Sequence, residues 1–84
     1  ERKYLLNVEL EDNSKLNGTF ILKSNDNKSC ELIPVTNDIK IKDNKISRCI
    51  YNKESDSITI QCGIKTIHQK IKVCRGFKLK YIDL

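Results

Sequence analysis

Apolar and polar residues alternate one by one in short runs along this chain, and this alternation constrains the fold more than any other feature. The clearest run spans residues 67–84, where apolar residues alternate with lysines on both sides of Cys74, Arg75 and Gly76. Successive side chains of a β-strand point to opposite faces, so the run predicts strands with one apolar and one polar face. Three residues that include a glycine suit a hairpin loop. We therefore predict a hairpin over 67–84 with its loop at residues 74–76.

Six further runs precede this hairpin, and polar turn sequences separate them. The predicted strands are 6–10, 19–23, 30–35, 39–42, 46–51 and 57–62. Pro34 has no amide hydrogen to donate, so the 30–35 strand lies at a sheet edge or ends there. A turn centred on residues 55 and 56 would place Cys49 opposite Cys62. One face of that hairpin would then hold Cys49, Tyr51, Ile58, Ile60 and Cys62.

Residues 64–74 allow two interpretations. Ile64, Ile67, Ile71 and Cys74 fall at helical spacing, whereas the many β-branched residues favour a strand. We adopt the strand because the rest of the chain is strand-like. The predicted fold class is all-β, a small disulfide-stabilised antiparallel β-sandwich or open barrel, with residues 1–84 forming a single domain. The alternative is an α+β fold with one short helix at 64–74.

Cysteine content points to a covalent framework. The 84-residue chain is small for a self-sufficient core, and it contains four cysteines, Cys30, Cys49, Cys62 and Cys74. An even number of cysteines in a short chain is typical of secreted, disulfide-bonded domains. The intervening spacings of 18, 12 and 11 residues contain no CxxC pair, which disfavours a zinc site. Four cysteines allow three pairings, and the sequence does not choose among them.

Two further features bear on location: the first indicates a soluble chain, and the second is consistent with secretion. The sequence shows no apolar run of the ~20 residues that a membrane helix needs. Glycosylation sequons occur at Asn17 and Asn27, both in predicted turns. About one such match is expected by chance in a chain this rich in Asn, Ser and Thr, so the sequons are a weak signal.

Lysines dominate the charge of the chain, which has 16 basic and 11 acidic residues and a net charge of +5. In the predicted 67–84 hairpin, Lys72 would face Lys78 and Lys70 would face Lys80, with Arg75 at the tip. Like charges directly opposite one another are unfavourable unless an anion lies over them. These five residues form the candidate binding site, and an anionic polysaccharide is a candidate ligand.

Two observations weaken that interpretation. Lys, Asn and Ile are the residues that AT-rich codons encode, and exposed strands often carry lysines that prevent aggregation. The five aromatic residues share the parity of the predicted core, whereas nucleic-acid modules place stacking aromatics among their basic residues. Nucleic acid is therefore a disfavoured partner.

Catalytic signatures are weak. His68 is the one histidine of the chain, which excludes a two-histidine ribonuclease and a histidine-rich metal site. A mechanism using His68 with Glu54 and Arg48 has no support from spacing. We expect no catalytic residue, no metal and no cofactor. The predicted function is a secreted, non-enzymatic module that binds a protein partner, as an effector or ectodomain fragment. The alternatives are polyanion binding, a small inhibitor or toxin presenting the loop at 52–56, and a small hydrolase or ribonuclease.

Overall fold

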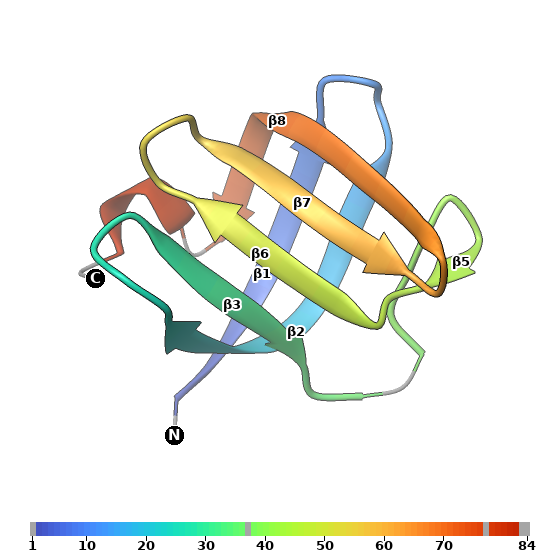
Figure 1. Cartoon of the computed structure of the whole chain (residues 1–84), viewed down its shortest axis with the longest axis horizontal. Helices are drawn as coiled ribbons and strands as arrows, with labels where there is room; N and C mark the ends of the chain where they lie inside the picture. Colours follow the sequence, from blue (N-terminus) through green and yellow to red (C-terminus); the bar gives the residue numbers. More distant parts are fainter. Residues whose placement is uncertain (1, 37, 77, 83–84) are drawn as a thin grey trace.

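Six antiparallel strands form a closed barrel in the computed structural model, which describes residues 2–36, 38–76 and 78–82. The barrel strands, in spatial order, are β1 (Lys3–Leu10), β2 (Lys15–Ser24), β3 (Ser29–Pro34), β6 (Arg48–Asn52), β7 (Ser57–Cys62) and β8 (Lys65–Gly76). A small separate hairpin, β4 (Lys40–Ile41) with β5 (Asn44–Lys45), is inserted between β3 and β6 (Figure 1). The all-β prediction is confirmed, and β3 ends at Pro34 as expected.

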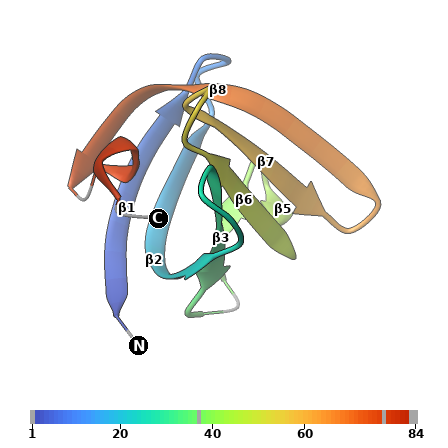
Figure 2. The same ribbon diagram turned by 60° about the vertical axis from the view of Figure 1, so that its left-hand side comes forward.

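The barrel is closed, so the predicted sandwich or open barrel is wrong on this point. β8 closes the barrel, because its 12 residues are enough to pair with two neighbouring strands. Its first half pairs with β7, from Lys65 to Lys70, and its second half pairs with β1, from Ile71 to Gly76. Figure 2 shows β8 crossing from β7 to β1 over one end of the molecule. Closure pairs the two end strands of the sheet with each other, which reduces the unpaired edge that could serve as a template for aggregation.

A β-bulge in β8 explains why residues 64–74 resembled a helix. Val73 pairs with Glu9, but the next pair joins Ile71 to Leu10, so Lys72 is an extra residue in β8. The bulge reverses the parity of the strand, and the inward positions become Ile67, Ile71 and Cys74. Their spacings of four and three residues imitate helical periodicity. The alternative helix at 64–74 is wrong.

The predicted hairpin loop at residues 74–76 is also wrong, because β8 continues through Cys74 and Arg75 to Gly76. Gly76 has a φ of +75°, and an added Cβ would lie 3.1 Å from the Leu5 carbonyl oxygen, so the strand ends at a residue that tolerates this conformation. The chain then forms a 3₁₀ turn, η1 (Leu79–Tyr81), where a strand was predicted. Phe77 lies outside the described residues.

Inward-facing side chains of all six barrel strands form one core. Its largest fully buried members are Tyr51, Phe20, Leu6, Leu10, Leu16, Leu32, Ile41, Ile58, Ile60 and Leu79. The face predicted for the β6–β7 hairpin is confirmed as an inner face, since its five residues are all buried. The register differs by two residues from the predicted one: Cys49 pairs with Ile60, and Tyr51 pairs with Ile58.

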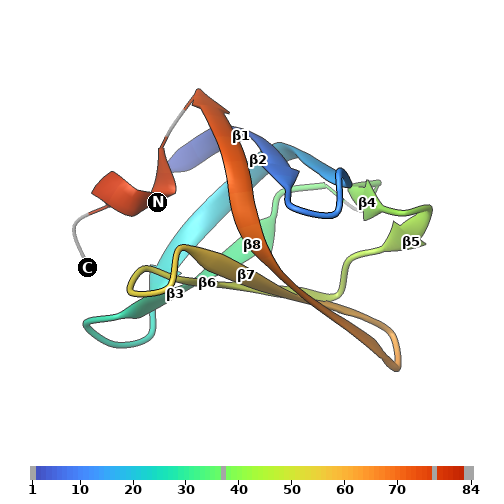
Figure 3. The same cartoon turned by 90° about the horizontal axis from the view of Figure 1, so that it is seen from above.

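The β4–β5 hairpin covers one end of the barrel and contributes Ile39, Ile41 and Ile46 to the core (Figure 3). It is needed there because β2 pairs with β3 only from Phe20 to Ser24, which leaves the first half of β2 without a strand neighbour on that side. Ile39 rests on Gly18, where a Cβ would lie 2.6 Å from the Ile39 Cδ1 atom. Because Gly18 has no Cβ, the Ile39 side chain can pack directly against it.

An ion pair fixes the tip of this covering hairpin. The Lys42 Nζ atom lies 2.5 Å from Asp12 Oδ2, and Asp12 also accepts hydrogen bonds from the Ser14 amide and hydroxyl in the β1–β2 turn. The Lys42 ammonium and the Ser14 bonds hold the pKa of the Asp12 carboxyl well below its ordinary value of 3.8. The tip residues Lys42 and Asp43 both have positive φ, as a two-residue turn of type I′ requires.

The opposite end of the barrel is held by the β6–β7 turn. The buried Tyr51 hydroxyl donates a 2.8 Å hydrogen bond to Asp56 Oδ1, and the Ile71 amide donates to the Asp56 carbonyl oxygen at 3.0 Å. Burial, with the Asp56 bond second, raises the pKa of Tyr51. Lys53 Nζ donates to the Ile82 carbonyl oxygen at 2.6 Å, which ties the C-terminal segment to this end.

Candidate protein-interaction surface

Four branched aliphatic side chains lie on the outer wall of β1, β2 and the end of β3, where water and not the core surrounds them. We call this set the outer aliphatic face: Leu5, Ile21, Ile33 and Val35. Leu5 is 61% exposed and Val35 is 37% exposed, while Ile21 and Ile33 are partly exposed. Exposed apolar clusters of this kind mark interaction sites in small proteins more often than isolated apolar residues do.

Strand register makes these four residues neighbours. Ile21 pairs directly with Ile33 across β2 and β3. Leu5 pairs with Thr19, which puts it one diagonal step from Ile21, and the Val35 amide donates a 3.0 Å hydrogen bond to the Thr19 carbonyl oxygen. Directly paired and diagonal side chains on one face of a sheet are within contact reach. The outer aliphatic face is therefore continuous.

Two lysines border this face. Lys3 pairs with Ile21, and Lys23 follows two residues after Ile21 on the same side of β2, where it pairs with Glu31. The Glu31 carboxylate also faces Arg48, whose Nε atom lies 3.8 Å away. Exposed pairs like this one contribute little to stability.

A shallow hollow of about 200 Å³ adjoins the outer wall where β1, β2 and β8 meet. Its lining comprises Asn7, Val8, Glu9, Lys15, Asn17, Val73 and Arg75. This is where the structure places Arg75, which pairs with Asn7. Arg75 is thus on the outer wall of β8 and not at a loop tip.

The predicted lysine face is not assembled in the predicted manner, because residues 78–80 do not pair with β8. Lys70 pairs with Ser57 on β7. Lys72 Nζ lies 3.7 Å from Glu9 Oε2 and 3.2 Å from Asn13 Oδ1. Lys80 Nζ lies 5.3 Å from the centre of the Tyr81 ring. The binding role of these residues stays a prediction.

Three of the five predicted basic residues nevertheless border one depression. A hollow of about 260 Å³ between β8, η1 and the β6–β7 turn is lined by Lys72, Lys78 and Lys80, together with Asp56, Cys74 and apolar residues. The Lys72 ammonium also lies within reach of Glu9 and Asn13.

Cysteines occupy the interior. Cys30, Cys49 and Cys62 are buried, Cys74 is partly buried, and no disulfide joins them within the described residues. Burial raises the pKa of the Cys30 thiol to about 11. Burial and then the neighbouring thiols of Cys30 and Cys62 raise the pKa of Cys49. Three thiols therefore lie near one another on the inner faces of β3, β6 and β7.

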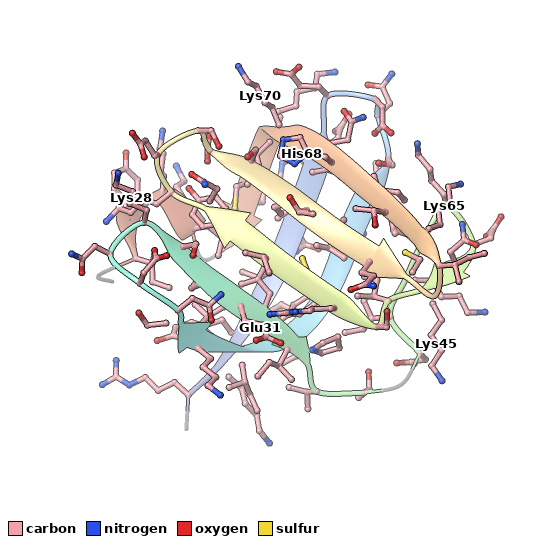
Figure 4. The ribbon with its side chains drawn as sticks, viewed as in Figure 1. Lys28, Glu31, Lys45, Lys65, His68 and Lys70 are labelled. Atoms are coloured by element: carbon pink, nitrogen blue, oxygen red, sulfur yellow. The ribbon has the colours of Figure 1, made fainter. Side chains whose placement is uncertain are left out.

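His68 lies on the outer wall of β8, where its Nδ1 atom is 2.8 Å from the Thr59 hydroxyl (Figure 4). The two residues considered as its catalytic partners are engaged elsewhere. Glu54 is 3.5 Å from Lys28, and Arg48 is 3.8 Å from Glu31. The described residues do not assemble these three groups into one site.

Both sequons are exposed. Asn17 lies within β2 and pairs with Asn7, so the prediction that it lies in a turn is wrong. Asn27 lies in the β2–β3 loop, where Asp26 accepts hydrogen bonds from the Lys28 and Ser29 amides.

Within the described ranges, no three His, Cys, Asp or Glu side chains are placed to hold a metal ion. The same ranges contain no helix of the length and apolarity needed to cross a membrane.

The outer aliphatic face was not found from the sequence, although a signal for it exists. Consecutive apolar residues in a strand place one side chain on each wall. The pairs Leu5-Leu6, Ile21-Leu22 and Leu32-Ile33 each do so. In each pair one residue packs into the barrel and the other faces outward. These breaks in the alternation were the available sign of an apolar outer wall.

Fold and surface together define a small, closed, antiparallel barrel with an apolar strip on its outer wall. Comparisons of the chain with protein families, with curated proteins and with solved structures found no match.

Proposed function

We propose that this chain is a secreted, non-enzymatic binding module that engages a protein partner through the outer aliphatic face. The observation that carries the proposal is the register that makes Leu5, Ile21, Ile33 and Val35 one continuous exposed cluster. Burying such a cluster against a partner is favourable by about 25 cal/mol per Å² of apolar surface removed from water.

The charge at the border of this face indicates the chemistry of the partner. Lys3 and Lys23 lie at the same end of the cluster, and the whole chain carries a net charge of +5. A second copy of the chain would bring further lysines to this border, where like charges repel. A protein with an apolar patch and acidic groups beside it is therefore the best fit.

Two disulfides complete the proposed module. Cys49 is close enough to Cys62 and Cys30 for their thiols to influence its pKa, and Cys30 and Cys74 both influence the pKa of Tyr51. These neighbours favour the pairing Cys49–Cys62, and Cys30 and Cys74 are then the two cysteines that remain for the second bond. Cys49 and Cys62 are diagonal neighbours across β6 and β7, so this bond requires the two strands to shift relative to each other. Oxidation would suit an extracellular location.

Polyanion binding is supported less well. The sequence-based prediction depended on a hairpin that placed four lysines on one face. In the barrel these lysines are distributed over different elements. The inhibitor or toxin and the hydrolase or ribonuclease gain no support from the loop at 52–56 or from the surroundings of His68.

Capture of partners by paired variants tests the proposal. The immobilised, refolded chain is exposed to extracellular proteins beside a Leu5→Asp variant and a Gln61→Asp control, which adds the same charge to the opposite wall. We expect wild type and the control to retain the same protein and Leu5→Asp to lose it. Equal retention by all three chains would contradict the proposal.

A further inference from the structure

The most exposed apolar side chain of the described residues belongs to Ile64, at the tip of the β7–β8 hairpin, where its relative exposure is 106%. Gly63 and Ile64 form a two-residue loop, and Gly63 has a φ of +64° at the first loop position, as a type II′ turn requires. The turn is tight and well defined by its strands. Ile64 therefore projects from a rigid tip and not from a loose loop.

Lysines surround this tip. Lys65 follows Ile64 directly, and Lys45 of β5 lines a hollow of about 520 Å³ together with Gly63, Ile46 and Cys62. Figure 4 shows Lys45 and Lys65 at the same end of the barrel, with Lys28 at the other. This end thus combines one protruding apolar side chain with ammonium groups beside it.

A direct like-charge pair adds to this basic end. Lys40 and Lys45 are opposite each other in the β4–β5 ladder, and both are exposed. Asp38 lies close enough to Lys40 for the lysine to lower its pKa, while the neighbouring Lys42 is engaged by Asp12. Like charges directly opposite one another destabilise a sheet, and an anion above them relieves the repulsion. Lys45 and Lys65 form no ion pair within the described residues.

We infer that this end of the barrel binds the surface of anionic lipid membranes, with Ile64 inserted and Lys40, Lys45 and Lys65 at the level of the headgroups. A single apolar side chain on a convex tip suits a soft layer that closes around it, whereas protein interfaces bury broad, complementary patches. Lysine ammonium groups near an anionic surface each add to the attraction, and their aliphatic stems lie along the apolar boundary. The outer aliphatic face lies on the side wall, so both surfaces can be occupied together.

Co-sedimentation with vesicles tests the inference. The folded chain is mixed with vesicles of phosphatidylcholine alone and of phosphatidylcholine with phosphatidylserine, at low and at physiological salt. We expect binding to the anionic vesicles only, weakened at least threefold by the higher salt. Absence of binding, or equal binding to both vesicle types, would overturn the inference.

Variants assign the binding to the tip. Ile64→Ser and the double variant Lys45→Glu/Lys65→Glu should each weaken vesicle binding about tenfold or more. The controls are Leu5→Ser, which removes another exposed apolar side chain, this one from the side wall, and Lys28→Glu at the other end. Full binding by Ile64→Ser, or a loss in Leu5→Ser as large as that in Ile64→Ser, would overturn the inference. If Ile64→Ser loses a captured protein and still binds vesicles normally, the tip is a protein contact instead.

The two proposals fail separately in these experiments. Leu5→Asp tests the side wall by protein capture, and Ile64→Ser tests the tip by vesicle binding. Circular dichroism of each variant checks that the barrel has folded, since both substitutions are at exposed positions that should leave the fold intact.

Discussion

Ile21 of β2 and Ile33 of β3 are directly paired on the outer wall of the barrel, and neither side chain takes part in the core. Strand residues exposed in this way are usually polar, since one wall of an antiparallel sheet faces water. The proposed function assigns these two isoleucines to the contact with a partner.

Replacing both isoleucines by threonine should separate binding from stability. Threonine is β-branched, so Ile21→Thr/Ile33→Thr keeps the strand preference while removing apolar surface. We expect the free energy of unfolding to change by less than about 1 kcal/mol, because both positions are at the surface. The affinity for the captured partner should fall at least tenfold, measured by calorimetry. Unchanged affinity would exclude these two residues from the interface.

The basic border should govern how fast the partner associates. Lys3→Glu/Lys23→Glu reverses both charges beside the outer aliphatic face, which should lower the association rate about tenfold and reduce its dependence on salt. Surface plasmon resonance at two salt concentrations measures both effects. The control is Lys28→Glu, since Lys28 is exposed. Lys53→Glu would be unsuitable, because the Lys53 ammonium donates a hydrogen bond to the Ile82 carbonyl oxygen. An equal effect of Lys28→Glu would mean that net charge alone is responsible.

Gly18 should be intolerant of any side chain. In Gly18→Ala the new Cβ would lie 2.6 Å from the Ile39 Cδ1 atom, so the Ile39 side chain or the covering hairpin has to shift. We expect a loss of about 1–3 kcal/mol in the free energy of unfolding, measured by urea denaturation. The loss should be smaller when Ile39→Val, which has no Cδ1 atom, is already present. Additive effects of the two substitutions would show that this contact is not the cause.

Asp12 should make the covering hairpin sensitive to acid. Because its folded pKa lies below the ordinary value of 3.8, the contribution of Asp12 to stability is complete above that pH and is lost as the pH falls below it. In Asp12→Asn this part of the acid dependence should disappear, and salt should weaken it in wild type. Thermal unfolding at several pH values below 5 measures the difference. Identical acid profiles for the two chains would show that the Asp12–Lys42 pair does not hold the covering hairpin in place.

Cysteine oxidation should change the alkaline stability of the chain. Burial raises the thiol pKa values of Cys30, Cys49 and Cys62, so in the reduced protein the unfolded state ionises first and stability falls as the pH rises above 9. The slope should be about 1.4 kcal/mol per pH unit for each thiol that ionises only when unfolded. The oxidised protein should lack this component, and peptide mapping without reductant should find Cys49 with Cys62 and Cys30 with Cys74. A chain that remains fully reduced in air would oppose the disulfide proposal.

Alternating apolar residues sufficed to predict the all-β class and the inner face of β6 and β7. Two features prevented a full prediction. The bulge at Lys72 changes the parity of β8 within the strand, so the residues beyond it could be placed neither by a period of two nor by a helix. Barrel closure depends on β8 reaching both β7 and β1, which is a property of tertiary pairing and not of any local run.

The candidate site was harder to predict than the fold, because an apolar patch on the outer wall depends on strand register, whereas charged residues are visible in the sequence. Lysines drew attention to residues 70–80, yet Lys72 is engaged by Glu9 and Asn13, and residues 78–80 form no strand with β8. Leu5 and Ile33 each adjoin another apolar residue, so the alternation does not assign them to one face of the strand. Only the register shows which of each pair faces outward.

Chemical-shift mapping of the barrel by NMR, with the captured partner added in steps, tests the central claim most directly. The account predicts that the amide signals that change most belong to the middle of β1, β2 and the end of β3, centred on Leu5, Ile21 and Ile33. Signals of β6 and β7 on the opposite wall should remain in place. Changes concentrated on β6 and β7, or around Lys78 and Lys80, would contradict it.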